Sequence, residues 1–254
     1  MSKERIRENA YSDYELYQQD FVDFSNATLE HLKGIDVFDM YWCTLIFKSW
    51  KDGVNHIGIR ELDEIFNELH QDVNASYYLA SMGLYRTANM HLRSMIELSL
   101  QLLYFFEHPV EFKKWRTGGF VIKHDKLKEY IKEYPSFDKQ PLKGEVNTLM
   151  EQISKEWKNY SKHIHAESLS YFQTQKQSGS TNAFTEADFG MWKSNFVKIV
   201  IKINKLFKFF FLIHINFFRL KIKNCFRCCR HQTNKLFKSD SQRLAFLPCV
   251  AFCV

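Results

Sequence analysis

The segment LYRTANMHLRSMIELSLQLLYFFE (Leu84–Glu107) is the longest uninterrupted helical pattern in the chain, and it is dense in apolar residues. On a helix that turns by about 100° per residue, these apolar residues cover most of the circumference. A helix that is apolar nearly all round is typical of the central element of a bundle. We therefore expect an all-α helical bundle built around this long central helix.

A polar stripe interrupts the apolar surface of this segment. It consists of Arg86, Arg93, Glu97 and Tyr104, which fall within an arc of roughly 40°. Charges in a packed interior need partners, because burying an unpaired charge is costly. Arg93 and Glu97 are four residues apart and can pair on one helix face. The stripe is either a structural ion pair that fixes how helices dock, or a polar site that binds a small anion or a nucleotide phosphate.

The composition is that of an ordinary globular protein rich in helix. Of the 254 residues, 45% are hydrophobic and 25% are charged, and there are only nine Gly and four Pro. The 24 Phe predict a bulky aromatic core. The first residues, MSKERIRENAYSDYE, are charged and lack the apolar stretch of a signal peptide. We therefore expect a cytoplasmic protein.

The last 36 residues differ sharply from the rest. Residues 219–254 carry eight Lys or Arg and one acidic residue, which leaves a net charge of −1 on residues 1–218. Five of the six Cys also lie there, with only Cys43 in the body. We predict a bundle domain over residues 1–218 and a poorly structured or non-native basic tail over 219–254. The cluster Cys225-x2-Cys228-Cys229-Arg-His231 lacks the second ligand pair of a structural zinc site, so no metal or cofactor is predicted.

Apolar spacing and helix breakers divide the bundle domain into helices. Gly83 either separates the central helix from its predecessor or kinks the two into one element, and Lys51–Gly58, with two glycines, predicts a turn. The polar stretch 173–183 predicts a loop. The expected helices span residues 9–33, 37–50, 59–82, 84–107, 110–115, 125–133, 144–165 and from 185 to about 215.

The phrases GLYRTANMHLRSMIELSLQLLYFFEHPVEFKKW (83–115) and YSKHIHAES (160–168) resemble a group of uncharacterised bacterial all-helical proteins. Those proteins are similar to HEPN-like domains, which often accompany bacterial toxin and anti-phage defence systems. The resemblance places Arg93, Glu97 and His165 at motif positions, together with His108 and Trp115. It implies a helical fold and contact with RNA or nucleotide. No Arg lies between Arg116 and Arg219, so the late Arg-x(4–6)-His motif of HEPN ribonucleases has no counterpart.

Two histidines are candidates for catalysis. His165 lies four residues after Ser161 near a helix end, where it could act as a general acid or base or contact phosphate. It could equally be held there by the helix dipole and the last carbonyls. His91 follows Arg86 by five positions, which matches the length of the HEPN ribonuclease motif.

Three functional hypotheses follow. The first is a HEPN-like bacterial protein, defence- or stress-associated, that contacts RNA or nucleotide through Arg86, Arg93, Glu97 and His165. The second is a non-catalytic homodimerisation module that uses the aromatic helix 37–50 and the Phe-rich last helix. The third is a toxin that acts at a membrane surface through Lys193–Phe218; the apolar run 207–218 is shorter than the roughly 20 residues that a membrane span needs.

Overall fold

The computed structural model describes residues 3–34, 37–56, 59–165, 167–172 and 184–229, and beyond Phe211 it describes only the backbone of the last helix. Within these ranges there are helices and no strands, which confirms the all-α prediction. The predicted loop 173–183 lies outside the described residues. The elements are α1 (Lys3–Lys33), α2 (Phe38–His56), α3 (Asp63–Ser81), α4 (Tyr85–Glu107), α5 (Pro109–Arg116), α6 (His124–Lys132), η1 (Pro135–Phe137), α7 (Leu142–His165), η2 (Leu169–Tyr171) and α8 (Glu186–Cys229).

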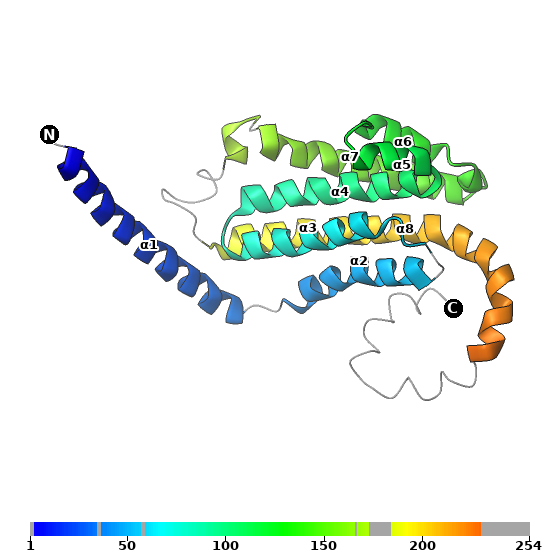
Figure 1. The fold of residues 1–254 in the computed structure, drawn as a ribbon, viewed down its shortest axis with the longest axis horizontal. Coiled ribbons are helices and arrows are strands. Elements are labelled where there is room, and N and C mark those ends of the chain that lie inside the picture. The colour runs from blue at the N-terminus through cyan, green and yellow to red at the C-terminus, as the bar shows by residue number, and fades with distance from the viewer. Residues whose placement is uncertain (1–2, 35–36, 57–58, 166, 173–183, 230–254) are drawn as a thin grey trace.

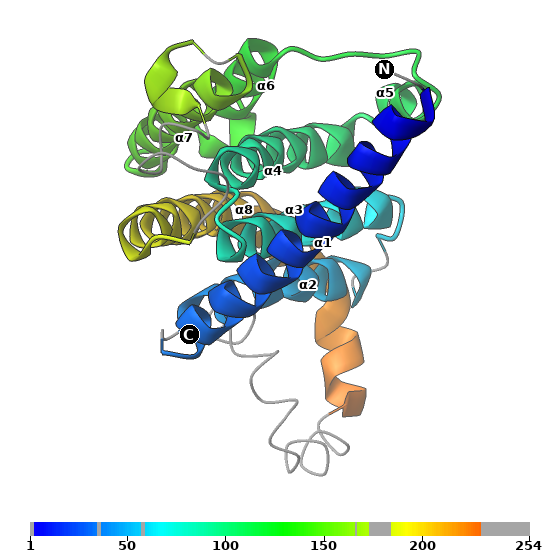
Figure 2. The same cartoon turned by 90° about the vertical axis from the view of Figure 1, so that its left-hand side faces the viewer.

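The helix α4 is the centre of the bundle, as its apolar circumference predicts. It contacts α3, α5, α6, α7 and α8. Both views of the ribbon place α7 and α6 on one side of α4 and α3 and α8 on the other (Figures 1 and 2). Leu92, Met95, Ile96 and Leu103 on α4 are completely buried. The helix α2 covers the outer side of α3 and α8.

Local chemistry explains where α3 and α4 are separated. Gly83 has a φ of 71°, a left-handed conformation that glycine adopts without steric cost. The Gly83 amide donates to the Ala80 carbonyl, and the Leu84 amide donates to the Leu79 carbonyl. This is the Schellman pattern that terminates a helix. Gly83 therefore separates the two helices rather than kinking a single one. At the other end of α4, Pro109 forces the helix to stop before it.

An aromatic cluster joins α2, α3 and α8. Phe207 on α8 is fully buried, and its ring meets the rings of Phe47, Trp50 and Phe66 edge-on, with centroids 5.9–6.3 Å apart. The Trp50 indole also donates to Asn204 Oδ1 at 2.7 Å. These contacts bring the bulky residues that the sequence predicted as core into one continuous interior.

The packing of α2 corrects the prediction of a turn over Lys51–Gly58. The helix continues through Gly53 and ends at His56. Val54, one turn after Trp50, is also buried, so contact with the core outweighs the helix-breaking tendency of Gly53. The following helix, α3, correspondingly begins at Asp63 rather than at residue 59.

The aromatic surface proposed for dimerisation is mostly interior. Phe47, Trp50, Phe210 and Phe211 are buried, whereas Phe38 and Tyr41 at the start of α2 remain more than half exposed. Among the described side chains of α8, Phe196, Phe207, Phe210 and Phe211 are buried in the core of the bundle. No helix in the described part of the chain is both long and apolar enough to cross a membrane.

The last helix runs past the predicted domain boundary. We expected α8 to end near residue 215 and the tail to begin at 219, but α8 continues to Cys229. The backbone of residues 219–229, the first part of the predicted tail, is therefore helical. Residues 230–254 of the predicted tail lie outside the described residues.

Phe207 offers a test of the aromatic core. Phe207→Ala should lower the free energy of unfolding by about 3–5 kcal/mol, because it removes a buried ring and leaves a cavity among three others. Urea denaturation followed by circular dichroism measures this loss. Val121→Ala, at a position that is 86% exposed, is the control and should change stability by less than about 0.5 kcal/mol. A loss below about 1 kcal/mol in Phe207→Ala would contradict the packing described.

Candidate functional site

The polar stripe of α4 faces α7, and two of its charges meet there. Arg93 Nη2 lies 2.9 Å from Glu97 Oε1, which confirms the predicted pair. Trp157 on α7 donates from its indole Nε1 to the same Glu97 oxygen at 2.8 Å. The Arg93 guanidinium lies 5.1 Å from the centre of the Trp157 ring, within the range of a cation–π interaction. The Arg93 and Glu97 side chains are 23% and 31% exposed, so the pair is half-buried rather than fully enclosed.

Arg86 contacts the C-terminal end of α7. Its Nε donates to the His163 carbonyl at 2.8 Å, and its Nη2 donates to the Ile164 carbonyl at 3.4 Å. The last carbonyls of a helix have no partner within the helix, and a cation there also complements the helix dipole. Arg86 therefore caps α7, and the two carbonyls that it binds belong to the residues just before His165. The His165 residue itself is exposed.

His91 faces a different helix. Its Nδ1 lies 2.7 Å from Asp72 Oδ1 on α3, and Asp72 is only 5% exposed. The two candidate catalytic histidines therefore take part in different contacts: His91 joins α4 to α3, whereas His165 ends α7. Asp72 was not among the predicted site residues, because its position opposite His91 depends on how α3 and α4 pack.

Tyr104 stands apart from the three charged residues of the stripe. Its ring stacks on that of His108 with centroids 3.9 Å apart and meets Tyr130 edge-on at 5.1 Å. Glu107 accepts hydrogen bonds from the hydroxyls of Tyr130 and Tyr134. Burial, and secondarily the nearby Glu111 carboxylate, raise the pKa of Tyr104. Tyr104 thus belongs to an aromatic corner between α4 and α6, and the four stripe residues do not form one site.

His124 joins the α4–α7 contact from α6, and sequence analysis did not single it out. Its ring stacks on the Trp157 ring with centroids 4.1 Å apart, and its Nε2 lies 3.3 Å from Ser154 Oγ on α7. The residue is 8% exposed. Burial lowers the pKa of His124 to about 4; the Asp125 carboxylate opposes this shift, and the cations of Lys128, Arg93 and Lys158 add to it. His124 is therefore a neutral ring in the site at physiological pH.

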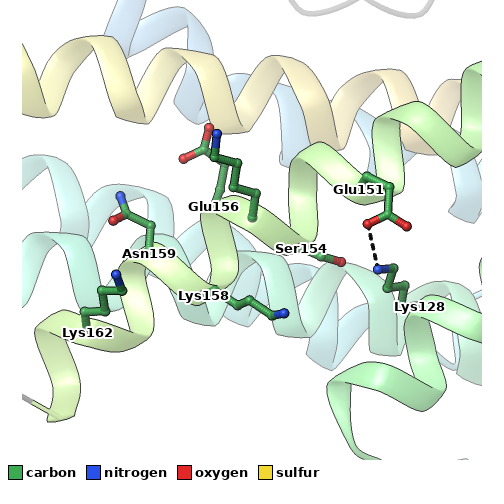
Figure 3. Close-up of a pocket in the computed structure, with 8 residues that line it drawn as sticks. Lys128, Glu151, Ser154, Glu156, Lys158, Asn159 and Lys162 are labelled. Carbon is green, nitrogen blue, oxygen red and sulfur yellow. Dashed lines mark hydrogen bonds and ion pairs between the residues drawn. The ribbon is translucent and has the colours of Figure 1, made fainter. Parts of the chain in front are cut away.

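A groove of about 590 Å³ lies on the outer side of α7, beside His124 and Ser154. Figure 3 shows Lys158 from α7 and Lys128 from α6 reaching toward the position of Ser154. The groove contains four lysines and two glutamates, and we call it the lysine groove. Its lining residues are Lys128, Glu151, Ser154, Lys155, Glu156, Lys158, Asn159 and Lys162.

Both glutamates of the lysine groove are already neutralised by lysines. Glu151 accepts from Lys128 and Lys132, and Glu156 accepts from Lys202 at 2.8 Å. Within the described residues, by contrast, Lys155, Lys158 and Lys162 have no ion pair, and Lys162 Nζ lies 5.8 Å from the centre of the Tyr171 ring. The row of Lys155, Lys158 and Lys162 therefore provides positive charge that no carboxylate of the described structure compensates.

The spacing of this row is a signal that sequence analysis could have used. Residues 155, 158 and 162 are separated by three and four positions, so they lie along one face of a helix and rise by about 10 Å. Such a row can hold neighbouring anionic groups of one extended ligand. No three metal-ligating side chains come together in the described part of the chain, and the side chains of Cys225, Cys228 and Cys229 lie outside it.

Comparison with known proteins adds a family to this geometry. Residues 64–197 match the sequence profile of a family of unknown function, DUF5677. The match covers α3 to the first part of α8 and so includes the α4–α7 contact and the lysine groove. No curated protein and no solved structure is significantly similar to the chain.

The neutral state of His124 predicts how stability depends on pH. Its folded pKa of about 4 lies below the ordinary value near 6.5, so between these values the unfolded chain binds more protons than the folded one. Stability should therefore fall as the pH falls from 6.5 to 4, by up to about 3 kcal/mol from this residue alone. Urea denaturation at a series of pH values measures the slope.

Two variants separate this effect from the titration of other groups. His124→Gln should flatten the dependence between pH 6.5 and 4, because it removes the group that must be kept neutral. Val121→Ala, at an exposed position without a titrating group, should leave the wild-type slope unchanged. An unaltered slope in His124→Gln would contradict the role assigned to His124.

Proposed function

The chain belongs to DUF5677, a family of unknown function, and we propose that it is a HEPN-like helical protein that contacts RNA through the lysine groove. The observation that carries the proposal is the row of Lys155, Lys158 and Lys162, which has no ion-pair partner in the described structure. Nucleic acid backbones carry closely spaced negative charges, and lysines and arginines that neutralise them supply much of the binding energy.

The α4–α7 contact supports the proposal by holding the groove rigid. Trp157 is fixed from one helix by Glu97 and Arg93 and from another by the stacked His124 ring. Arg86 holds the end of the same helix. Because α7 is anchored in this way, its lysines keep their spacing. Less conformational entropy is therefore lost when an extended ligand binds.

Two parts of the proposal, the HEPN-like class and the association with defence or stress, rest on the sequence resemblance. Residues 83–115 and 160–168 resemble bacterial all-helical proteins that are similar to HEPN-like domains. The two phrases are in contact across α4 and α7, since Arg86 of the first bonds to the carbonyls of residues 163 and 164 of the second. Unchanged phage plating on bacteria that express the protein, in comparison with cells that lack it, would speak against a defence role.

RNA binding through the groove can be measured by fluorescence anisotropy with a labelled 20-nucleotide single-stranded RNA. The triple variant Lys155→Gln, Lys158→Gln, Lys162→Gln should raise the Kd by about tenfold or more at 100 mM salt. It should also reduce the slope of log K against log salt by about 2, because each lost phosphate contact in single-stranded nucleic acid contributes about 0.7.

The matched control removes the same charge elsewhere. Lys48→Gln, Lys113→Gln, Lys114→Gln replaces three exposed lysines on α2 and α5 and should leave the affinity within about twofold. Equal losses in both triple variants would mean that only net charge matters and would overturn the groove assignment. Saturable binding of ATP at millimolar concentration, with no measurable RNA binding, would indicate a nucleotide ligand in place of an RNA chain.

The same RNA, incubated with the protein and resolved on a denaturing gel, tests the two candidate histidines. If the protein cleaves RNA, His165→Ala should abolish cleavage without changing stability, because His165 is exposed next to the helix end that Arg86 caps. His91→Ala should instead lower stability by about 1–3 kcal/mol, because it leaves the buried Asp72 without its partner. Cleavage that survives in His165→Ala would remove His165 from the catalytic candidates.

A further inference from the structure

One face of α8 is apolar along its middle and carries lysines on its flanks. Val197 and Ile201 form the apolar strip, and Ile201 is 58% exposed. Lys193 lies on one side of the strip, and Lys198 and Lys202 lie on the other, as the helical spacing requires. Residues 190–202 contain three lysines and no acidic residue. We call this surface the α8 face; it consists of Gly190, Lys193, Ser194, Val197, Lys198, Ile201 and Lys202.

The α8 face is open enough for a second helix to pack on it. A Cβ placed on Gly190 would meet no atom within 4 Å, and the neighbouring Met191 is 50% exposed. Exposed apolar side chains in a row along a helix are typical of a contact surface when they are continuous and have polar edges. This surface adjoins the lysine groove through the bond between Lys202 and Glu156, but its lysines lie on α8, whereas those of the groove lie on α6 and α7.

The helix α1 has the opposite charge and stands apart from the bundle. Figures 1 and 2 show it leaving the end of the bundle, close to which only its C-terminal part lies. Near that end Thr28 is buried and Leu32 packs against the core. Between Ala10 and Val22, by contrast, every described side chain is exposed, including those of Tyr11, Tyr14 and Val22.

The sequence of α1 complements the α8 face in both charge and length. Residues 11–23 contain four acidic residues and no Lys or Arg. They span 13 positions, as do residues 190–202, which corresponds to about 20 Å of helix in each case. Helices in proteins gain most of their stability from packing an apolar face against other elements. A partner for the exposed part of α1 would therefore present apolar and positively charged side chains.

We propose that this partner is the α8 face of a second copy of the chain, and that two copies exchange their α1 helices reciprocally. A two-fold arrangement forms the same contact twice, with the acidic α1 of each copy on the basic α8 face of the other. Direct pairing of α1 with α1 in parallel would instead bring the acidic segments together, which is unfavourable.

The test is sedimentation equilibrium of the full-length protein at 5–100 µM concentrations, on the order of those at which homodimers of moderate affinity form. The wild type should be dimeric. One variant reverses charges on α1 (Asp13→Lys, Glu15→Lys, Asp20→Lys), and another reverses charges on the α8 face (Lys193→Glu, Lys198→Glu). Lys202 is left in place because it bonds to Glu156. Each variant alone should be monomeric, with a dimer Kd raised at least tenfold.

An equimolar mixture of the two variants should form a heterodimer. In the mixture, the basic α1 of the first variant meets the acidic α8 face of the second, and the two unaltered surfaces form the wild-type contact. This recovery also shows that both variants are folded. Lys113→Glu, Lys114→Glu on α5 is the control with the same change in charge as the α8-face variant and should remain dimeric.

Several results would overturn the proposal. A wild type that is monomeric at 100 µM would exclude a reciprocal dimer in that range. An α8-face variant that stays dimeric would point to contact between α1 helices, and an α1 variant that stays dimeric would point to another surface. If neither variant dimerises alone and the equimolar mixture forms no heterodimer, the charges of α1 do not pair with those of the α8 face.

Discussion

The contact between α4 and α7 depends on how Arg93 is accommodated. The residue lies on the most enclosed helix of the bundle, where a guanidinium needs both a counter-charge and hydrogen-bond acceptors. Glu97, one turn further along the same helix, supplies the charge at 2.9 Å. Trp157 then bonds to that carboxylate and covers the cation with its ring. A pair on one helix is thereby converted into a link between two helices.

This link sets the position of α7 along α4. Trp157 is held beside Arg93, and the carbonyls of residues 163 and 164 are held by Arg86, one to two turns away. Two anchors on one helix define both its sliding position and its rotation about its own axis. The inner face of α7 thus packs against α4 and α6. Its outer face presents Lys155, Lys158 and Lys162 in a constant arrangement. The helix contacts and the proposed RNA contact therefore fall on opposite faces of α7.

The details that sequence analysis missed share a common cause. Gly53 indicates a turn when it is considered locally, but α2 passes through it because Val54 and Trp50 are buried against other helices. His124 at the start of a short helix carries no local signal, and it matters only because α6 places it against Trp157. Asp72 and His91 are 19 positions apart and form a pair only through the packing of α3 on α4. Each of these features depends on which helix faces pack against each other, and a single sequence does not specify this packing directly.

The sequence by itself determined the helical class, the central place of Leu84–Glu107, the stop before Pro109 and the Arg93–Glu97 pair. These features depend on periodicity, on proline geometry and on contacts within one helix, all of which act over a few residues. The tertiary structure alone decided that Tyr104 belongs to a separate aromatic corner and that Arg86 caps α7. It also decided that the lysines of α7 lie together along one groove, away from the charged residues of the stripe. The reason is physical: a side chain's partners across a helix interface depend on the docking of two elements, and docking is a property of the whole core.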